Sequence, residues 1–266
     1  MKRFGLCIAA ALALAALTPA TAQDQEYVVR YAPGAEFPDD PASEAAVWSF
    51  VNFVELDRDD FTAHGGGTHN GNEDASGRFL LLWSEEGLFL MVEVTDDSHL
   101  NTNAGGGIWN GDSVQVVFEP TGERRAGLSK YEYNFGLGAP NSATPHFARA
   151  FNHPEAPPMN TDDFYFMFER VEEEKLTKYV VFFPVAHLAP AVLEVDSRIG
   201  MGMVINDGDD EPGQQGQKGW LGWGANSVVF AKDTSQTNLL ILSEESLSVD
   251  PAGKLAASWA AIKTGR

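Results

Sequence analysis

Apolar and polar residues alternate along much of this chain, so that apolar side chains recur at every second position. In the segment 130–138, Tyr131, Tyr133 and Phe135 alternate with Glu132 and Asn134. A period of two is typical of a β-strand that buries one face. Comparable runs bounded by turn residues predict strands at 26–32, 77–84, 87–96, 112–120, 130–138, 163–172, 177–185, 199–207 and 237–245.

Helical patterns are scarce by comparison. The segment 186–195 predicts a turn or two of helix, and 253–263 predicts a short helical tail. Many short strands separated by turns favour an all-β fold, an antiparallel β-sandwich of the jelly-roll kind. The segments 57–76 and 138–161 are predicted as long loops, which are often functional. Because no repeat or low-complexity linker divides the chain, we predict one domain.

The N-terminal residues have the pattern of a secretory signal peptide. Lys2 and Arg3 precede an apolar run at 4–17, and Ala20-Thr21-Ala22 forms a small-residue cleavage site. We therefore predict a signal peptide at 1–22, a domain at 23–266 and a secreted or periplasmic location. The single cysteine, Cys7, lies within the signal peptide. A mature chain without disulfides depends on its core or on metal ions for stability.

The charge is strongly acidic and narrows the choice of partners. The formal net charge of the chain is −20, and it becomes −22 when Lys2 and Arg3 are removed, because residues 1–22 contain no acid. Such a surface repels the phosphates of nucleic acids and anionic lipid headgroups. We therefore expect neither nucleic acid nor membrane as a partner. Neutral ligands and cations suit the chain better.

The common catalytic motifs are missing from the sequence. The run HGGG at 64–67 matches the oxyanion loop of some esterases, but the G-x-S-x-G motif that accompanies it does not occur. There is no H-E-x-x-H motif, and the mature chain has no cysteine for thiol catalysis. We therefore expect no enzymatic activity. A glycosidase built on two carboxylates is kept as an alternative, because their geometry cannot be read from sequence.

Acidic residues gather where the predicted strand 87–96 ends. Asp96, Asp97 and Asn101 lie close together in the sequence, and Asp112 follows one loop later. Carboxylate and amide oxygens are the ligands that Ca²⁺ prefers. The cluster therefore predicts a calcium site, with a solvated turn as the alternative. The segment 206–213 begins like an EF-hand loop, but Lys218 occupies the position of the bidentate glutamate.

Several sequence blocks occur together in a recognisable order. They read LFLMVEVTDDSHLN, WNGDSVQVVFEP, YEYNFGL, FFPVAHL, GMVINDGD, GWLGWG and KDTSQTNLLIL. In order and spacing the chain resembles family 9 carbohydrate-binding modules over residues 40–243. The resemblance implies an antiparallel β-sandwich, non-catalytic sugar binding and structural calcium, with Asp97 at a ligand position. It also implies a role in polysaccharide catabolism beside secreted glycoside hydrolases such as xylanases.

The resemblance also implies a sugar site. Trp109 matches the tryptophan that forms one wall of an aromatic clamp around a terminal sugar, and Gln115 and Asn134 match polar contacts. An indole face packs well on the apolar face of a pyranose ring. The second clamp tryptophan is replaced by Ala231, and Phe230 is a candidate for the missing wall. Trp220 and Trp223 are further candidates, although packing within the fold is the alternative for both.

A second function class uses a related sandwich fold. Related domains bind haem or transfer electrons, which requires axial ligands to the iron. Met201, Met203, His99 and His146 are the candidates for that role in this sequence. A methionine on a strand is more often part of a core, so sugar binding is the preferred hypothesis.

Overall fold

The structure is a computed structural model, and it describes residues 25–32, 53–138, 144–209 and 215–246. The described chain is all-β. Its strands are β1 (Glu26–Tyr31), β2 (Val54–Leu56), β3 (Phe61–Ala63), β4 (Ala75–Ser84), β5 (Gly87–Asp96), β6 (Ser113–Glu119), β7 (Tyr131–Leu137), β8 (Pro145–Phe151), β9 (Tyr165–Val171), β10 (Leu176–Pro184), β11 (Arg198–Asp207), β12 (Gly219–Trp223) and β13 (Asn238–Ser246).

Single turns of 3₁₀-helix interrupt the connections between strands. They are η1 (Arg58–Asp60), η2 (Gly105–Gly107), η3 (Thr161–Asp163), η4 (Glu172–Glu174), η5 (Val185–Leu188), η6 (Ala225–Ser227) and η7 (Thr234–Gln236). Within the described ranges, no helix has the length and apolar character needed to cross a membrane. The predicted signal peptide at 1–22 and the predicted helix at 253–263 lie outside these ranges.

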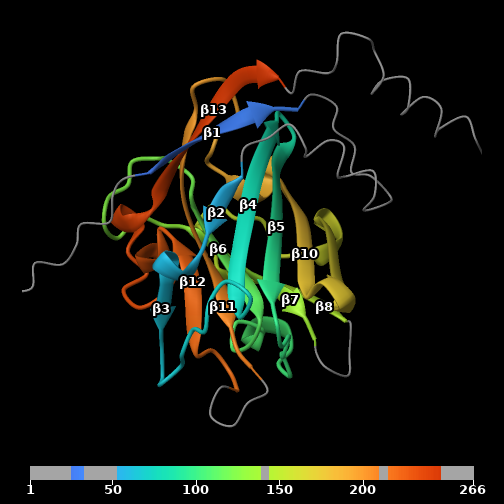
Figure 1. The fold of residues 1–266 in the computed structure, drawn as a ribbon. Coiled ribbons are helices and arrows are strands. Elements are labelled where there is room, and N and C mark those ends of the chain that lie inside the picture. Colours follow the sequence, from blue (N-terminus) through green and yellow to red (C-terminus); the bar gives the residue numbers. More distant parts are fainter. Residues whose placement is uncertain (1–24, 33–52, 139–143, 210–214, 247–266) are drawn as a thin grey trace, which may run out of the picture.

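The strands form two layers of a sandwich that β1 connects. The hydrogen-bonded order is β8-β7-β6-β11-β13-β1-β4-β5-β10-β9, with β12 between β11 and β3 and with β2 beside β4. Most pairs are antiparallel, whereas β1 runs parallel to both β13 and β4. In Figure 1 the blue strand β1 lies next to the red strand β13. The first and last described strands are therefore paired neighbours in the sheet.

The main core fills the space between the two layers. Phe118 of β6 packs edge-on against Phe183 of β10, with ring centroids 5.0 Å apart. Phe135 of β7 stacks at 5.5 Å on Phe168 of β9. Aromatic pairs at these separations stabilise a core beyond the area that they bury. The alternate positions of β6 and β7 lie on the outer face of their layer, and they include Gln115, Glu132 and Asn134.

Each of the nine predicted strands corresponds to a strand of the structure, and the all-β sandwich is confirmed. The structure adds β2, β3, β8 and β12, of which β3 lies within the predicted loop 57–76 and β8 within 138–161. These strands are short or lie at a sheet edge, where the alternation of buried and exposed residues is weak. In place of the predicted helix at 186–195, the chain forms only the single 3₁₀ turn η5.

Candidate functional site

A pocket of about 380 Å³ lies on the outer face of the layer that contains β6, β7 and β12. Its size falls within the range of about 300–1,000 Å³ that is typical of small-ligand sites. All four residues predicted for sugar contact line this one pocket, namely Trp109, Gln115, Asn134 and Phe230. Residues from four separate segments of the sequence therefore converge on one cavity.

The polar floor of the pocket comes from two neighbouring strands. Gln115 of β6 and Asn134 of β7 are directly opposite each other in the sheet register. Both are buried, and Gln115 Nε2 donates to Asn134 Oδ1 at 3.3 Å. Among the described residues, neither Gln115 Oε1 nor Asn134 Nδ2 has a hydrogen-bond partner. One acceptor and one donor are therefore left for a ligand.

Sequence reasoning missed an ion pair at the edge of this floor. Lys232 Nζ lies 2.8 Å from both carboxylate oxygens of Glu132, which is itself buried. Lys232 Nζ also donates to the main-chain oxygen of Val228 at 2.8 Å. The alternation in β7 could have identified Glu132, because it shares a face with Asn134. No local signal in the sequence points to Lys232.

The segment before β13 presents an aromatic side chain to the pocket. Phe230 is 67% exposed and lines the pocket, whereas the neighbouring Ala231 does not. Phe230 and Lys232 both have a left-handed backbone, with φ of 53° and 50°. That conformation costs non-glycine residues on the order of 1–3 kcal/mol and is concentrated at functional sites. This backbone places Phe230, instead of Ala231, on the pocket wall.

Trp109 lies in the long connection between β5 and β6. Hydrogen bonds within this connection hold it in place. Its side chain is 40% exposed and lies outside the buried clusters of the described residues. Asn101 Nδ2 donates to the main-chain oxygens of Ile108 at 2.7 Å and Asp112 at 3.0 Å. Asn101 Oδ1 accepts from the main-chain nitrogen of Asn103. These bonds fix the turn from which Trp109 projects.

The other aromatic and methionine candidates are mostly core residues. Trp223, Met201 and Met203 are buried within the main core between the layers. Trp220 is 2% exposed and packs in a second cluster on the outer face, but it also lines the pocket, where its ring lies 5.0 Å from that of Phe230. The core positions of the two methionines favour the core alternative over axial ligation of haem.

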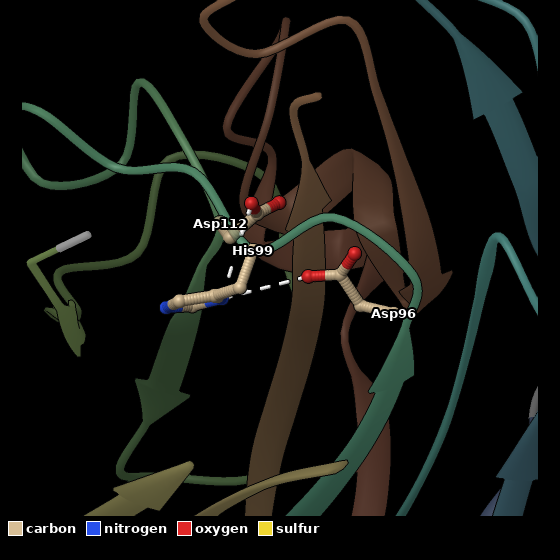
Figure 2. Close-up of side chains that lie close together, drawn as sticks. All are labelled: Asp96, His99 and Asp112. Carbon is tan, nitrogen blue, oxygen red and sulfur yellow. Dashed lines mark ion pairs between the residues drawn. The ribbon is translucent and has the colours of Figure 1, made fainter. Parts of the chain in front are cut away.

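The acids at the end of β5 separate into two clusters. Asp97 joins Asp74 and Asp209, with one oxygen of each within 4.8 Å of the others. Asp96 joins His99 and Asp112, and Figure 2 shows these three side chains pointing toward one another. Successive residues at a strand end point to opposite sides, which explains the separation. Asp96 and Asp97 therefore lie in different clusters, and the Asn101 amide is hydrogen-bonded within its own loop.

The carboxylates of this region are buried beside one another. Burial and the neighbouring Asp209, Asp96, Asp74 and Asp97 raise the pKa of Asp207 to about 8. Burial, together with Asp96 and Asp207, also raises the pKa of Asp112 well above its usual range. Desolvation and like charges both disfavour the ionised form of a carboxyl group. Ionisation of all these carboxyl groups together is therefore unfavourable unless a cation lies among them.

Together the fold and the pocket define a β-sandwich binding module, with a polar floor and aromatic walls on one outer face. The chain belongs to the carbohydrate family 9 binding domain-like family, whose sequence model matches residues 41–244. Members of this class are binding modules and not catalytic domains. The match covers every described strand except β1 and the last residues of β13. No curated protein matches the sequence.

The solved structures that share the fold include two complexes of binding modules. Both are family 9 carbohydrate-binding modules from Caldicellulosiruptor kristjanssonii. The cellotriose complex has a TM-score of 0.58 and 14% identity, and the match covers 85% of this chain and 98% of that one. The glucose complex has a TM-score of 0.56 and 13% identity, and the match covers 85% of this chain and 100% of the other. At these identities the likeness establishes the fold.

Proposed function

We propose that this protein binds a neutral carbohydrate in the pocket formed by Trp109, Gln115, Asn134 and Phe230. The observation that carries the proposal is the convergence of these residues on one cavity. Exposed aromatic faces can cover the apolar face of a pyranose ring, and amide groups can bind its hydroxyls. The free acceptor of Gln115 and the free donor of Asn134 match the two roles that a sugar hydroxyl can play.

The charge of the pocket also supports a neutral ligand. Its buried carboxylate, Glu132, is neutralised by Lys232, so the floor has no unpaired charge for an ionic ligand. Cello-oligosaccharides are the first probes, because the two similar structures are complexes with cellotriose and glucose. Xylo-oligosaccharides are the second. A glycan array probed with the purified chain tests the proposal, and no binding to any neutral glycan would contradict it.

Substitutions at Phe230 and Ala231 test which residue forms the second wall. We expect Phe230→Ala to weaken sugar binding by about 5- to 30-fold, because an exposed ring that covers a ligand contributes on the order of 1–2 kcal/mol. Phe230→Trp should retain or tighten binding. Ala231→Trp, the matched control at the neighbouring exposed position, should leave the affinity unchanged. Isothermal titration calorimetry would measure all three, and tighter binding by Ala231→Trp alone would place the wall at residue 231.

We further propose that Asp74, Asp97 and Asp209 bind a structural calcium ion. Their oxygens lie within 4.8 Å of one another, and an all-carboxylate set suits a hard cation. Asp74 immediately precedes β4, Asp97 follows β5 and Asp209 follows β11. A bound ion would therefore hold three strand ends together. The raised pKa of Asp207 beside these residues supports the need for a positive charge there.

The proposed biological setting is outside the cytoplasm. The signal-peptide pattern at 1–22 supports a secreted or periplasmic protein, cleaved after Ala22. There the module would bind polysaccharide fragments or bring secreted glycoside hydrolases close to their substrate. Its acidic net charge keeps such a protein soluble and away from anionic surfaces.

A further inference from the structure

A buried imidazole distinguishes the cluster of Asp96, His99 and Asp112 from its all-oxygen neighbour. The three side chains are only 4–6% exposed. His99 Nδ1 lies 3.5 Å from Asp96 Oδ2 and 3.9 Å from Asp112 Oδ2, as the dashed lines in Figure 2 indicate. Calcium prefers oxygen ligands alone, whereas a nitrogen beside carboxylates suits transition metals such as zinc.

The orientation of His99 determines which of its nitrogens faces the acids. His99 Nε2 lies 3.3 Å from the main-chain oxygen of Leu137, which can only accept a hydrogen bond. In a neutral ring Nε2 therefore carries the hydrogen, and Nδ1 directs a lone pair at two carboxylate oxygens. Three electron-rich atoms then converge in a buried space, and this arrangement is unfavourable unless a proton or a metal ion lies among them.

The surroundings of the cluster are those expected for a metal site. Ligating histidines usually donate their second N–H to a carbonyl or carboxylate, and ligating carboxylates are themselves hydrogen-bonded. Asp112 accepts from the main-chain nitrogens of Leu100 and Gly208, the latter at 2.8 Å. Asp96 Oδ1 accepts from the main-chain nitrogen of Ser98 at 2.8 Å. In the described chain, no lysine or arginine pairs with either carboxylate, so Asp96 Oδ2 stays available.

The distances favour a metal over a proton. Metal–ligand bonds of about 2.1 Å in a tetrahedral site place the ligand atoms about 3.4 Å apart. The two separations from His99 Nδ1, 3.5 and 3.9 Å, are close to that value, and all three ligand atoms lie within 4.8 Å of one another. A proton on Nδ1 would make one long hydrogen bond to Asp96 and none to Asp112, because 3.9 Å exceeds hydrogen-bond reach.

We propose that Asp96, His99 and Asp112 bind a divalent transition-metal ion of the zinc class, separate from the calcium ion held by Asp74, Asp97 and Asp209. Asp96 and His99 lie at the start of the connection between β5 and β6, and Asp112 lies at its end. The ion ties these two ends together. The same connection carries Trp109, so the metal holds the platform residue in place, and this last consequence alone rests on the proposed sugar site.

Zinc itself is the probe for this site. The chain is stripped with chelator, saturated with 1 mM calcium to fill the all-oxygen site, and titrated with Zn²⁺ by calorimetry. We expect one zinc ion per chain and slower amide hydrogen exchange in residues 97–112. His99→Gln should lower zinc affinity by at least about 100-fold, since even outer-shell changes cost about 10- to 100-fold. His153→Gln, a histidine outside the cluster, is the matched control and should bind zinc normally.

The proposal would be overturned by an absence of stoichiometric zinc binding, by unchanged zinc affinity in His99→Gln, or by displacement of zinc by calcium at equal concentration. The first would mean that the cluster holds only a proton. Circular dichroism checks that the His99→Gln variant folds. If this variant does not fold, the Asp96→Asn variant takes its place.

The visible spectrum of the Co²⁺-loaded wild-type chain gives a readout that needs no variant. Intense bands indicate the proposed four-coordinate site with nitrogen, and weak bands indicate an all-oxygen site and contradict it.

Discussion

Trp109→Ala is expected to weaken glycan binding by about 30- to 150-fold while leaving the fold intact. Loss of an indole face that covers a sugar removes about 2–3 kcal/mol of binding free energy. The side chain is 40% exposed and lies outside the buried clusters of the described chain. Its removal should therefore change stability by about 0.5 kcal/mol or less, or about 2 °C in Tm. Calorimetry with the glycan found on the array and a thermal melt measure the two effects.

Two further variants separate a binding role from a structural one. Trp109→Phe keeps a smaller platform and should retain intermediate affinity. Trp223→Ala removes a tryptophan of the main core and should destabilise the protein by about 3–5 kcal/mol. If Trp109→Ala instead resembles Trp223→Ala, with lower Tm and unchanged affinity per folded molecule, then Trp109 anchors its loop and does not bind sugar.

Removal of calcium is expected to lower the melting temperature by roughly 5–10 °C. An ion that binds only the folded state, at a concentration 100 times its Kd, stabilises that state by about 2.7 kcal/mol. For a domain of this size, each kcal/mol corresponds to about 2–4 °C. Calcium should restore the loss, whereas magnesium should not, because it requires a tight octahedral shell. Melts in chelator, calcium and magnesium measure the effect, and identical curves in chelator and calcium would contradict it.

Variants and pH sharpen the calcium test. Asp97→Asn should reduce the calcium-dependent gain in Tm, and Asp162→Asn, an exposed acid on η3, should not.

The folded-state pKa of Asp207 is about 8, above its ordinary value of 3.8. Its contribution to stability is therefore complete below about pH 4 and is lost as the pH rises to 8. In chelator, Tm should fall between pH 5 and pH 8, and Asp207→Asn should flatten that decline.

Local patterns in the sequence were sufficient for nine of the thirteen strands and for the outward-facing side chain of Asn134. The alternation in 130–138 correctly separated the core residues Tyr131, Tyr133 and Phe135 from the outward-facing Asn134. A period of two depends only on backbone geometry, so it can be read without knowledge of strand order. The same rule failed for β8, because an edge strand buries too little of either face to impose a clear pattern.

Only the tertiary structure decided which side chains meet. Asp96 and Asp97 are neighbours in the sequence, yet strand geometry sends them to different clusters, and the Asp97 cluster draws Asp209 from the far end of β11. Asn101, an apparent metal ligand, uses its amide to hold the loop of Trp109. Phe230, whose backbone is left-handed, lines the pocket, whereas the neighbouring Ala231 does not. The sequence by itself determined the residue types, the strands and the family. Pairing register, loop hydrogen bonds and backbone conformation decided the site, because they bring together residues that no local pattern connects.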